Sequence, residues 1–302
     1  MSAGAPLHLR VLAWAVRRLP AGRYRVMNRV PRGGGAFQAR LPRAAGGYAY
    51  ACDLRDLIAR EVFFTGAYGP QETAILRATL RPGATFVDVG ANWGYFTLLA
   101  AHLVGGSGRV IAMEPDPRLH ALLAGNAAAN GLRQVSAVAE AASDREGMAE
   151  LAGCDLATGN WGVSSIVAKT AGPRFEVRTR RIDELLDEWE VERVELLKMD
   201  IEGAEEMALA GMAAGLARGR YRRVLVELHP TLAPGGRGLA ARVRGTMEGA
   251  GYRGWSVASS RAATRRAAYR AADARSLLQP LDAGADDAWP HQLWIAPGEE
   301  PL

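Results

Sequence analysis

The stretch TFVDVGANWGYFTLLA, residues 85–100, decides the fold class of this chain. Residues 85–89 are a short run of strand formers, and such a run suits a parallel strand that is covered on both faces. Gly90 follows the run, and residues 95–103 have the composition of an apolar helix that ends at a pair of glycines. A strand, a glycine turn and a helix in direct succession predict the first unit of a parallel α/β sheet.

The alternation of strand and helix patterns continues on both sides of this stretch. Further strands are predicted at residues 109–113, 135–139, 194–199 and 224–228. Helices are predicted at residues 70–80, 117–129, 182–189, 204–216 and 239–250. Near the C-terminus, residues 254–258 and 291–296 are predicted as a final pair of strands, with the arginine-rich residues 261–275 between them as a solvated helix or loop. This alternation is typical of a doubly wound, mostly parallel α/β sheet with helices on both faces.

The composition is that of an ordinary globular protein, since 49% of the 302 residues are hydrophobic and 23% are charged. This length favours one or two domains. Residues 1–60 are predicted as a partly helical N-terminal extension, and residues 61–302 as the α/β domain. The two cysteines, Cys52 and Cys154, exclude a disulfide framework and a four-thiolate zinc site. They give no sign of an oxidising compartment, and we expect a cytoplasmic protein.

The formal net charge of +5 would by itself favour a nucleic acid or an anionic surface as a partner. Because nearly all of this charge is arginine spread along the chain, we expect no nucleic-acid partner. No run of about 20 apolar residues is present that would span a membrane. The apolar residues 9–16 are followed by arginines, which is the wrong order for a signal peptide. They predict an amphipathic helix packed on its own domain, with weak peripheral membrane contact as the alternative.

The residues that follow the first two strands predict the ligand, because an open α/β sheet binds ligands at the carboxyl ends of its strands. Gly90 and Gly94 allow a tight turn, but Asn92 stands where a dinucleotide-binding loop has its second glycine, which disfavours a pyrophosphate. Asp88 would attract an ammonium group, and Glu114 would accept both hydroxyl protons of a ribose. A ligand with a ribose, an amino-acid ammonium and no phosphate is S-adenosylmethionine. The alternative is that both carboxylates only cap helix N-termini.

Four blocks of sequence, in this order, resemble the motifs of one family. FVDVGANWGYFTLLAA (residues 86–101) resembles the first motif of class I methyltransferases, and in particular that of the FkbM family. Three further blocks resemble later motifs of that family: MEPDPRLHALLAGNAAANG (113–131), RIDELLDEWEVERVELLKMDIEGAE (181–205) and VLVELHP (224–230). Residues 159–165 also resemble a glycine-and-serine loop that is common in the family.

The resemblance implies a Rossmann-like sheet of seven strands, the last of them antiparallel, and S-adenosylmethionine as the methyl donor. It usually implies a hydroxyl acceptor on a sugar, a polyketide or another secondary metabolite. It covers about residues 61–230, so residues 61–302 would be the methyltransferase domain, with a variable acceptor-side region at about 231–290. We expect these residues to bind the donor: Asp88, Gly90, Asn92, Gly94, Tyr95, Glu114 and Asp116.

Methyl transfer to a hydroxyl needs a base near the methyl group, and two later strand ends supply candidates. These are Asp200 and Glu202 after one strand, and Glu227 and His229 at the next. We expect His229 to be the base and Asp200 to orient it, because the pKa of histidine suits a base near neutral pH. Asp200 or Glu227 acting directly is the alternative. Each candidate also has a purely structural interpretation, such as a helix cap or a hydrogen bond to the backbone.

Three further points stay open in the sequence. Carboxylates clustered with a histidine would suit a divalent metal ion, but no spacing is diagnostic of one. Trp161, Ser164 and Ser165 either line the acceptor pocket or belong to a surface loop. Glu205 and Glu206 are interpreted as partners of a helix dipole in its first turn. The acceptor, the atom that is methylated and the oligomeric state are not specified by any pattern.

Two other functions compete with small-molecule methylation. A nucleic-acid methyltransferase that methylates amino groups typically carries Asn/Asp-Pro-Pro-Tyr at the fourth strand end, where residues 200–203 read Asp-Ile-Glu-Gly. Two carboxylates there would also repel a phosphate backbone. A donor-binding protein without catalysis is the other alternative. A nicotinamide-dependent dehydrogenase is disfavoured by Asn92.

Overall fold

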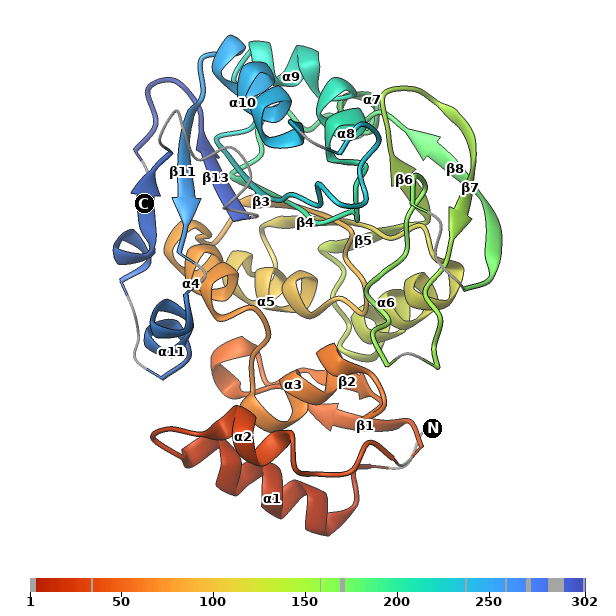
Figure 1. The fold of residues 1–302 in the computed structure, drawn as a ribbon, viewed down its shortest axis with the longest axis vertical. Helices are drawn as coiled ribbons and strands as arrows, with labels where there is room; N and C mark the ends of the chain where they lie inside the picture. The colour runs from red at the N-terminus through yellow and green to blue at the C-terminus, as the bar shows by residue number, and fades with distance from the viewer. Residues whose placement is uncertain are drawn as a thin grey trace.

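The computed structural model of this chain describes residues 4–33, 35–157, 159–168, 172–236, 238–258, 260–269, 273–281, 291–300 and 302. Its centre is a sheet with helices on both faces, and the N-terminal helices and a hairpin lie against one side of this body (Figure 1). The expected doubly wound α/β fold is confirmed.

The central sheet has eight strands in the described part of the chain. In spatial order they are β5 (Val135–Val138), β4 (Arg109–Met113), β3 (Thr85–Val89), β9 (Leu196–Met199), β10 (Arg223–Glu227), β13 (His291–Ile295), β11 (Arg253–Val257) and β12 (Leu278–Pro280). The five strands from β5 to β10 are parallel. The chain runs outward from β3 to β4 and β5 on one side and from β9 to β10 on the other, so the strand order reverses between β3 and β9. Ligands bind beyond the carboxyl ends of the strands at such a point.

The far edge of the sheet holds the expected reversed strand and one strand more than expected. β13 runs antiparallel to β10, as the family resemblance implies. The expected number of seven strands is wrong by one, because β12 pairs with β11 as an additional edge strand. β12 has three residues and ends in Pro280, so it is too short to show a periodic pattern in the sequence.

The buried strands alternate their side chains between two layers of core. Phe86 and Leu196 belong to one hydrophobic cluster, and Val87 and Leu197 to the other. The helices that cover one face are α4 (Pro70–Thr79), α5 (Tyr95–Val104) and α6 (Pro117–Ala129) (Figure 1). Those on the other face are α7 (Ile182–Glu188), α8 (Glu205–Ala210), α9 (Ala213–Ala217) and α10 (Leu239–Gly249) (Figure 1). Both faces of the parallel strands are therefore covered, as their apolar sequences predict.

The prediction of a single helix over residues 204–216 is wrong, because the structure has two helices there, α8 and α9. The division lies at Gly211, whose carbonyl accepts the backbone N–H of Asp183 at 3.4 Å. A Cβ at Gly211 would lie 2.0 Å from the carbonyl oxygen of Ser143. The close approach of two backbone segments at this glycine breaks a pattern that otherwise reads as one helix.

The N-terminal segment is more regular than expected. Its elements are α1 (Leu7–Arg18), α2 (Arg23–Met27), β1 (Phe37–Arg40), the 3-10 helix η1 (Arg43–Ala45), β2 (Ala49–Cys52) and α3 (Leu57–Thr65). β1 and β2 form an antiparallel hairpin. The backbone N–H groups of Ala49 and Ala51 donate to the side-chain oxygens of Asn130 at 2.8 Å and Asn126 at 2.7 Å, which ties the hairpin to the end of α6. α3 spans residue 60, and the division of the chain at that residue stays a prediction.

α1 is the amphipathic helix that residues 9–16 predict. Ala13 and Val16 are buried where the helix packs against α3, and Leu7, Val11 and Trp14 are exposed on its other face. None of the described helices is long and apolar enough to cross a membrane. Peripheral contact of the exposed face with a membrane surface stays a prediction.

Two further features complete the fold. A small sheet of β6 (Glu140–Ala142), β8 (Arg174–Arg180) and β7 (Gly147–Ala152) was not expected, since β6 has only three residues and four of the seven residues of β8 are charged. In the arginine-rich segment, α11 (Arg261–Tyr269) is a helix that packs against α4 and buries Ala263, and η2 (Ala274–Leu277) follows it. Residues 270–272 of that segment lie outside the described residues.

Candidate active site

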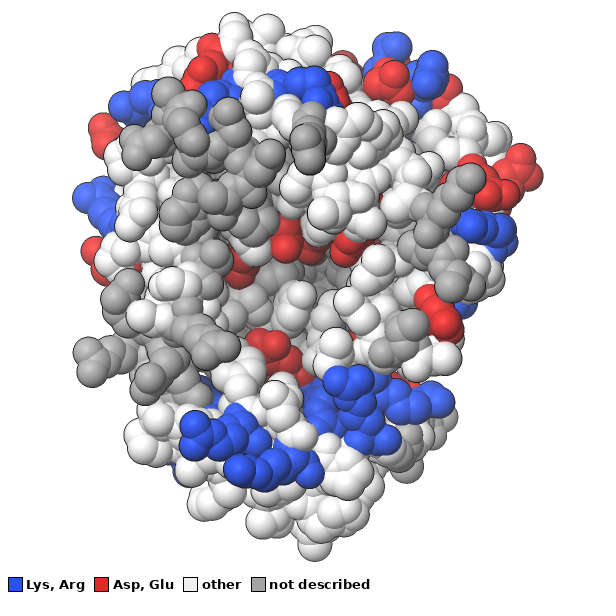
Figure 2. Space-filling model, viewed as in Figure 1, with Lys and Arg blue, Asp and Glu red and all other residues white. Residues whose placement is uncertain are grey.

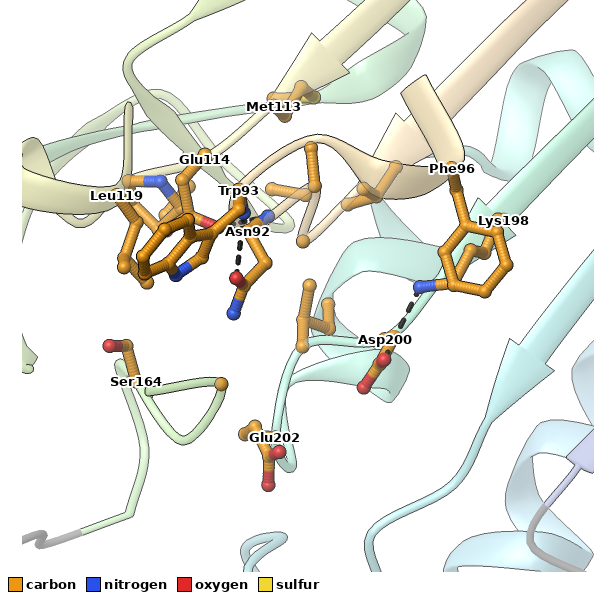
Figure 3. Close-up of a pocket in the computed structure, with 18 of the residues that line it drawn as sticks. Asn92, Trp93, Phe96, Met113, Glu114, Leu119, Ser164, Lys198, Asp200 and Glu202 are labelled. Atoms are coloured by element: carbon orange, nitrogen blue, oxygen red, sulfur yellow. Dashed lines mark hydrogen bonds and ion pairs between the residues drawn. The ribbon is translucent and has the colours of Figure 1, made fainter. Parts of the chain in front are cut away.

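A pocket of about 250 Å³ lies at the carboxyl ends of β3, β4, β9 and β10. Figure 3 shows Glu114, Asn92 and Trp93 on one side of it, and Asp200, Lys198 and Phe96 on the other. Nine of the expected site residues line this pocket: Gly90, Asn92, Tyr95, Glu114, Ser164, Asp200, Glu202, Glu227 and His229. The structure thus brings together residues from four strand ends that are up to 139 positions apart in the sequence.

Gly90 allows the ends of β3 and β9 to approach each other. Its φ is +80°, and a Cβ at this position would lie 1.9 Å from the carbonyl oxygen of Asp200. Any other residue would clash with the backbone of the neighbouring strand end, and its backbone conformation would also be strained. The glycine therefore holds the floor of the pocket close to Asp200.

Glu114 is buried at the end of β4, beside the half-buried Asn92, which follows β3. The backbone N–H of Asn92 donates to Glu114 Oε2 at 2.8 Å, and that of Asp116 donates to Glu114 Oε1 at 2.9 Å. Asn92 has a φ of +52°, a left-handed conformation that asparagine adopts more readily than most residues. Burial raises the pKa of Glu114 to about 7, although the two backbone hydrogen bonds oppose this shift. Glu114 thus presents a fixed carboxyl group to the pocket.

Asp88 lies behind the pocket wall, in contrast to its expected contact with the donor. It is fully buried and accepts a hydrogen bond from Thr97 Oγ1 at 2.6 Å. Lys198 is its register partner on β9. Burial raises the pKa of Asp88, while Lys198 and Thr97 lower it. The pKa of Asp88 stays raised overall, and its other oxygen, Oδ1, has no hydrogen-bond partner among the described residues.

Gly94 and Asp116 also lie behind the wall and have structural positions. Gly94 is the N-cap of α5, where a Cβ would lie 2.6 Å from Leu123 Cδ1. Asp116 caps α6 by accepting the backbone N–H of Arg118 at 3.0 Å, and it forms an ion pair with the Arg118 guanidinium at 2.6 Å. For Asp116 the geometry favours the helix-cap alternative.

Of the three residues expected at the acceptor, Ser164 lines the pocket, and Trp161 and Ser165 do not. Ser164 lines the pocket and donates to Asp116 Oδ2 at 3.0 Å. Trp161 is buried with its ring 5.3 Å from that of Trp93. Ser165 donates to the carbonyl oxygen of Glu202 at 2.7 Å. Trp161 and Ser165 therefore position the loop and the β9 end rather than face the pocket.

His229 is oriented by Glu205 and not by Asp200. Its Nδ1–H donates to Glu205 Oε1 at 2.7 Å, whereas Nε2 lies 3.6 Å from Glu202, 3.8 Å from Asp200 and 4.0 Å from Glu227. Glu205 is fully buried in the first turn of α8 and also accepts the N–H of Gly203 at 3.0 Å. The expected Asp200–His229 hydrogen bond is absent among these described contacts. No spacing in the sequence signals the Glu205 contact, because it joins two separate elements.

The carboxylates around His229 control its charge. Burial lowers the pKa of His229, but the Glu205 hydrogen bond and the charges of Asp200 and Glu202 outweigh burial and raise it to about 9. Burial raises the pKa of Glu202 to about 7, although the positive charge of His229 opposes the shift. At neutral pH both ring nitrogens of His229 therefore carry a proton, and the imidazolium is positively charged.

A second histidine completes the site and was not expected there. His291 Nε2 lies 3.0 Å from Glu72 Oε1 and 3.1 Å from Glu227 Oε2. Burial raises the pKa of Glu227, but the hydrogen bond from His291 and the charges of both histidines outweigh it and lower the pKa to about 2. His291 begins the last strand of the sheet and Glu72 lies in α4, so their meeting depends on the tertiary fold.

Asp200, Glu227 and His229 have ligand atoms within 4.8 Å of one another, a spacing that would allow a divalent metal ion. A metal would have to displace the proton of His229, which the pKa of about 9 holds in place at neutral pH. These side chains could hold a divalent cation once that proton is lost, and we assign none.

Acidic side chains gather along the hollow of the face in Figure 2, and basic side chains gather below it over the N-terminal elements. The charge at the mouth of the site is therefore negative. A strand-end pocket without a phosphate-binding glycine loop, with a carboxylate at the end of β4, is the arrangement that the first and second motifs predicted.

A family model described as the methyltransferase FkbM domain matches residues 88–253, more than half of the chain. The chain belongs to the FkbM methyltransferase family. This is a family of S-adenosylmethionine-dependent methyltransferases. The matched region begins within β3 and ends at the first residue of β11, so it contains most of the residues that line this pocket. The elements from α1 to α4 and from α11 to β13 lie outside the match.

Other known proteins match this FkbM-family chain more distantly. Ribosomal protein L11 methyltransferase of Pelotomaculum thermopropionicum is 43% identical over 58 residues, which is 19% of this chain and 18% of that protein. The chain thus spans under a fifth of the length of this curated relative. The methyltransferase FkbM of Methylobacillus flagellatus KT is 15% identical, with a TM-score of 0.36 over 78% of this chain and 52% of that one. A putative rRNA-methylase of Clostridium thermocellum is 12% identical, with a TM-score of 0.43 over 74% and 91%.

Proposed function

We propose that this methyltransferase transfers the methyl group of S-adenosylmethionine to a hydroxyl group of a small molecule, and that Asp200 accepts the hydroxyl proton. The observation that carries the proposal is that one pocket joins Glu114, at the end of β4, to Asp200, at the end of β9 (Figure 3). A donor whose ribose lies at Glu114 has its methionine end directed toward Asp200.

Glu114 is suited to hold the ribose. Each of its carboxylate oxygens accepts one backbone N–H and has a further lone pair for a hydroxyl proton. Hydrogen bonds to a charged group contribute about 1.5–3 kcal/mol each. Because both oxygens are fixed by the backbone, little side-chain entropy is lost when the ribose binds.

The reaction is an in-line displacement at the methyl carbon. The hydroxyl oxygen of the acceptor forms a bond to that carbon, the carbon–sulfur bond breaks, and its electron pair stays on sulfur to give S-adenosylhomocysteine. The hydroxyl proton passes to Asp200. Alignment of oxygen, carbon and sulfur can contribute up to about 7–11 kcal/mol, and proton removal a factor of roughly 10²–10⁴.

Asp200 is favoured as the base over His229. Nδ1 of His229 is occupied by Glu205, and a pKa of about 9 keeps a proton on the ring, so the imidazole has no free lone pair at neutral pH. Asp200 lies 3.3 Å from the ammonium group of Lys198, which holds the carboxylate in place. His229 would then act as a fixed positive charge beside Asp200.

A small molecule is favoured over a nucleic acid as the acceptor. Asp200, Glu202 and Glu227 all face the pocket, and their charges would repel the phosphates beside any base that entered it. Binding of RNA or DNA that weakens with salt would revive that alternative.

Calorimetric titration of the full chain with S-adenosylmethionine, S-adenosylhomocysteine and NAD is the first test. We expect saturable binding of the first two and none of NAD, followed by methyl transfer to members of a panel of sugars and polyketides. Glu114→Ala should weaken donor binding at least tenfold, while Glu188→Ala, whose side chain is 56% exposed, should not change it. Unchanged affinity in Glu114→Ala would refute the donor site. Tight binding without transfer to any hydroxyl would identify a donor-binding protein without catalysis.

A further inference from the structure

A second cavity of about 340 Å³ lies beside the donor pocket. Its wall is built by α2, α3, α4, α11 and the start of β13, together with the ends of β9, β10 and β11. Its volume is at the small end of the range of ligand pockets, which favours a small molecule over a polymer.

The two cavities share one wall. Tyr68, Phe96, Lys198, Asp200 and Glu227 line both of them. A donor in the first cavity and an acceptor in the second would therefore meet at Asp200, the residue proposed to take the proton. This position suits an in-line transfer between two ligands that enter from different sides.

The second cavity is formed largely outside the part of the chain that matches the family model. Tyr24, Glu61, Glu72, Thr264 and His291 line it, and all five lie outside residues 88–253. Thr264 is held by the side-chain amide of Gln71, which donates to its Oγ1 at 2.9 Å. The shared region of the family thus builds most of the donor pocket, while the segments before and after it build the second cavity.

The described lining of the second cavity is acidic. It contains four carboxyl groups, those of Glu61, Glu72, Asp200 and Glu227, and two basic groups, those of Lys198 and His291. The basic groups are already engaged, since Lys198 lies 3.3 Å from Asp200 and His291 lies 3.0 Å from Glu72 and 3.1 Å from Glu227. The carboxyl groups outnumber the basic groups by two, even when both basic groups are charged.

Of the four carboxyl groups that line the second cavity, Glu61 is the one without an ion pair among the described contacts. Its Oε1 accepts the hydroxyl of Tyr24 at 2.9 Å. Burial raises the pKa of Glu61 to about 7, although the Tyr24 hydrogen bond opposes the shift. A buried carboxyl group of this kind gains most from a ligand that brings a positive charge next to it.

Gly69 keeps this wall open. A Cβ at Gly69 would lie 2.6 Å from Glu72 Oε2 and 2.9 Å from Phe96 Cζ. Both neighbours line the cavity, so a side chain at this position would fill the space between Glu72 and the ring that borders the donor pocket.

We propose that the second cavity binds the methyl acceptor, and that this acceptor is a hydroxyl-bearing small molecule with a protonated amino group, such as an amino sugar. Its ammonium group binds at Glu61 and Glu72, and its hydroxyl group lies at Asp200. This inference rests on the proposed function and adds the class of the acceptor to it.

The test compares matched sugars on the full chain saturated with S-adenosylhomocysteine. Binding of D-glucosamine, D-glucose and N-acetyl-D-glucosamine is measured by ligand-observed NMR and calorimetry. We expect glucosamine to bind at least tenfold more tightly than the two neutral sugars. Equal binding of the three sugars, tighter binding of a neutral one, or no binding of any of them would overturn the proposal.

Two substitutions locate the amino group. Glu61→Gln keeps the size of the side chain and should weaken glucosamine binding about tenfold, so that the advantage over glucose disappears. Glu188→Gln, on the exposed surface of α7, should leave it unchanged. Tyr24→Phe removes the hydroxyl bound to Glu61 and should also alter the preference, which covers the case that Glu61→Gln fails to fold. An undiminished preference for glucosamine in Glu61→Gln, or an unchanged preference in Tyr24→Phe, would contradict the assignment to Glu61.

S-adenosylhomocysteine binding separates this inference from the function on which it rests. If the chain binds S-adenosylhomocysteine but shows no preference for the amino sugar, the acceptor class is wrong and methyl transfer stands. If it does not bind S-adenosylhomocysteine, the proposed function itself fails.

Discussion

His229 Nδ1 lies 2.7 Å from Oε1 of Glu205, a carboxylate that is fully buried beneath the end of β10. Together with the charges of Asp200 and Glu202, this contact outweighs burial and raises the pKa of His229 to about 9. The positive charge of this histidine is therefore a property of the folded site. It also decides which group can accept a proton.

Glu205→Gln should lower the pKa of His229. The amide can still accept the Nδ1–H hydrogen bond, but it removes one of the negative charges that stabilise the imidazolium. We expect the pKa to fall by at least one unit from about 9, as measured by NMR titration of the ring protons. Glu206→Gln, at the neighbouring exposed position, is the control and should leave the titration unchanged. A titration that is the same in all three proteins would show that Glu205 does not determine the charge.

Asp200→Asn should lower kcat far more than it changes donor affinity. If Asp200 accepts the hydroxyl proton, its loss removes a factor of roughly 10²–10⁴ from kcat, while the Kd of S-adenosylhomocysteine should stay within about twofold. His229→Gln should have a smaller effect on kcat. The reverse order of the two variants would return the role of base to His229.

Donor affinity should depend on pH through Glu114. Its pKa of about 7 in the folded protein is above the usual value, so the carboxyl group is mostly protonated at pH 6 and mostly ionised at pH 8. The ionised form is the one that accepts two ribose hydroxyls. The Kd of S-adenosylhomocysteine should therefore decrease about tenfold from pH 6 to pH 8, as calorimetry can measure.

Glu114→Gln separates this effect from the titration of other groups that line the pocket. The variant should bind the donor more weakly at pH 8, and its Kd should change little with pH. A tenfold dependence that persists in Glu114→Gln would assign the titration to another group, such as Glu202 with its pKa of about 7.

Metal removal should not change turnover. A cation between Asp200 and Glu227 would have to displace the proton that charges His229, and that positive charge already offsets the carboxylates around it. Steady-state rates measured with EDTA and with added magnesium should therefore agree within about twofold. A rate that falls with EDTA and is restored by magnesium would make these three residues metal ligands.

The site residues at the strand ends could be predicted from the sequence, because a polar residue after an apolar strand pattern is visible within a few positions of the chain. Asp200 and Glu202 come after β9, Glu227 is the last residue of β10 and His229 comes after it, and parallel strands place such residues at one edge of the sheet. Position after a strand does not, however, state which way a side chain faces. Asp88 shows this difference, since it lies within β3 and its carboxyl group is buried in the core, where it accepts a hydrogen bond from Thr97.

The residues that the sequence could not reveal are those that meet only in the tertiary fold. Glu205 reads as an ordinary acidic residue in the first turn of a helix, and nothing near it in the chain points to His229. Glu61 and His291 are 230 positions apart and line the same cavity. Charge pairing across such distances leaves no periodic pattern, because it depends on how the helices close over the sheet.

Gly90→Ala should destabilise the protein and weaken donor binding together. The alanine Cβ would lie 1.9 Å from the carbonyl oxygen of Asp200, and the φ of +80° adds about 1–2 kcal/mol of backbone strain. Gly131→Ala is the matched control, because its φ is +62° and a Cβ there has no heavy atom within 4 Å. In urea unfolding, the control should lose about 1–2 kcal/mol of stability and Gly90→Ala clearly more. Equal losses, with donor affinity unchanged in Gly90→Ala, would show that the ends of β3 and β9 can separate without cost to the site.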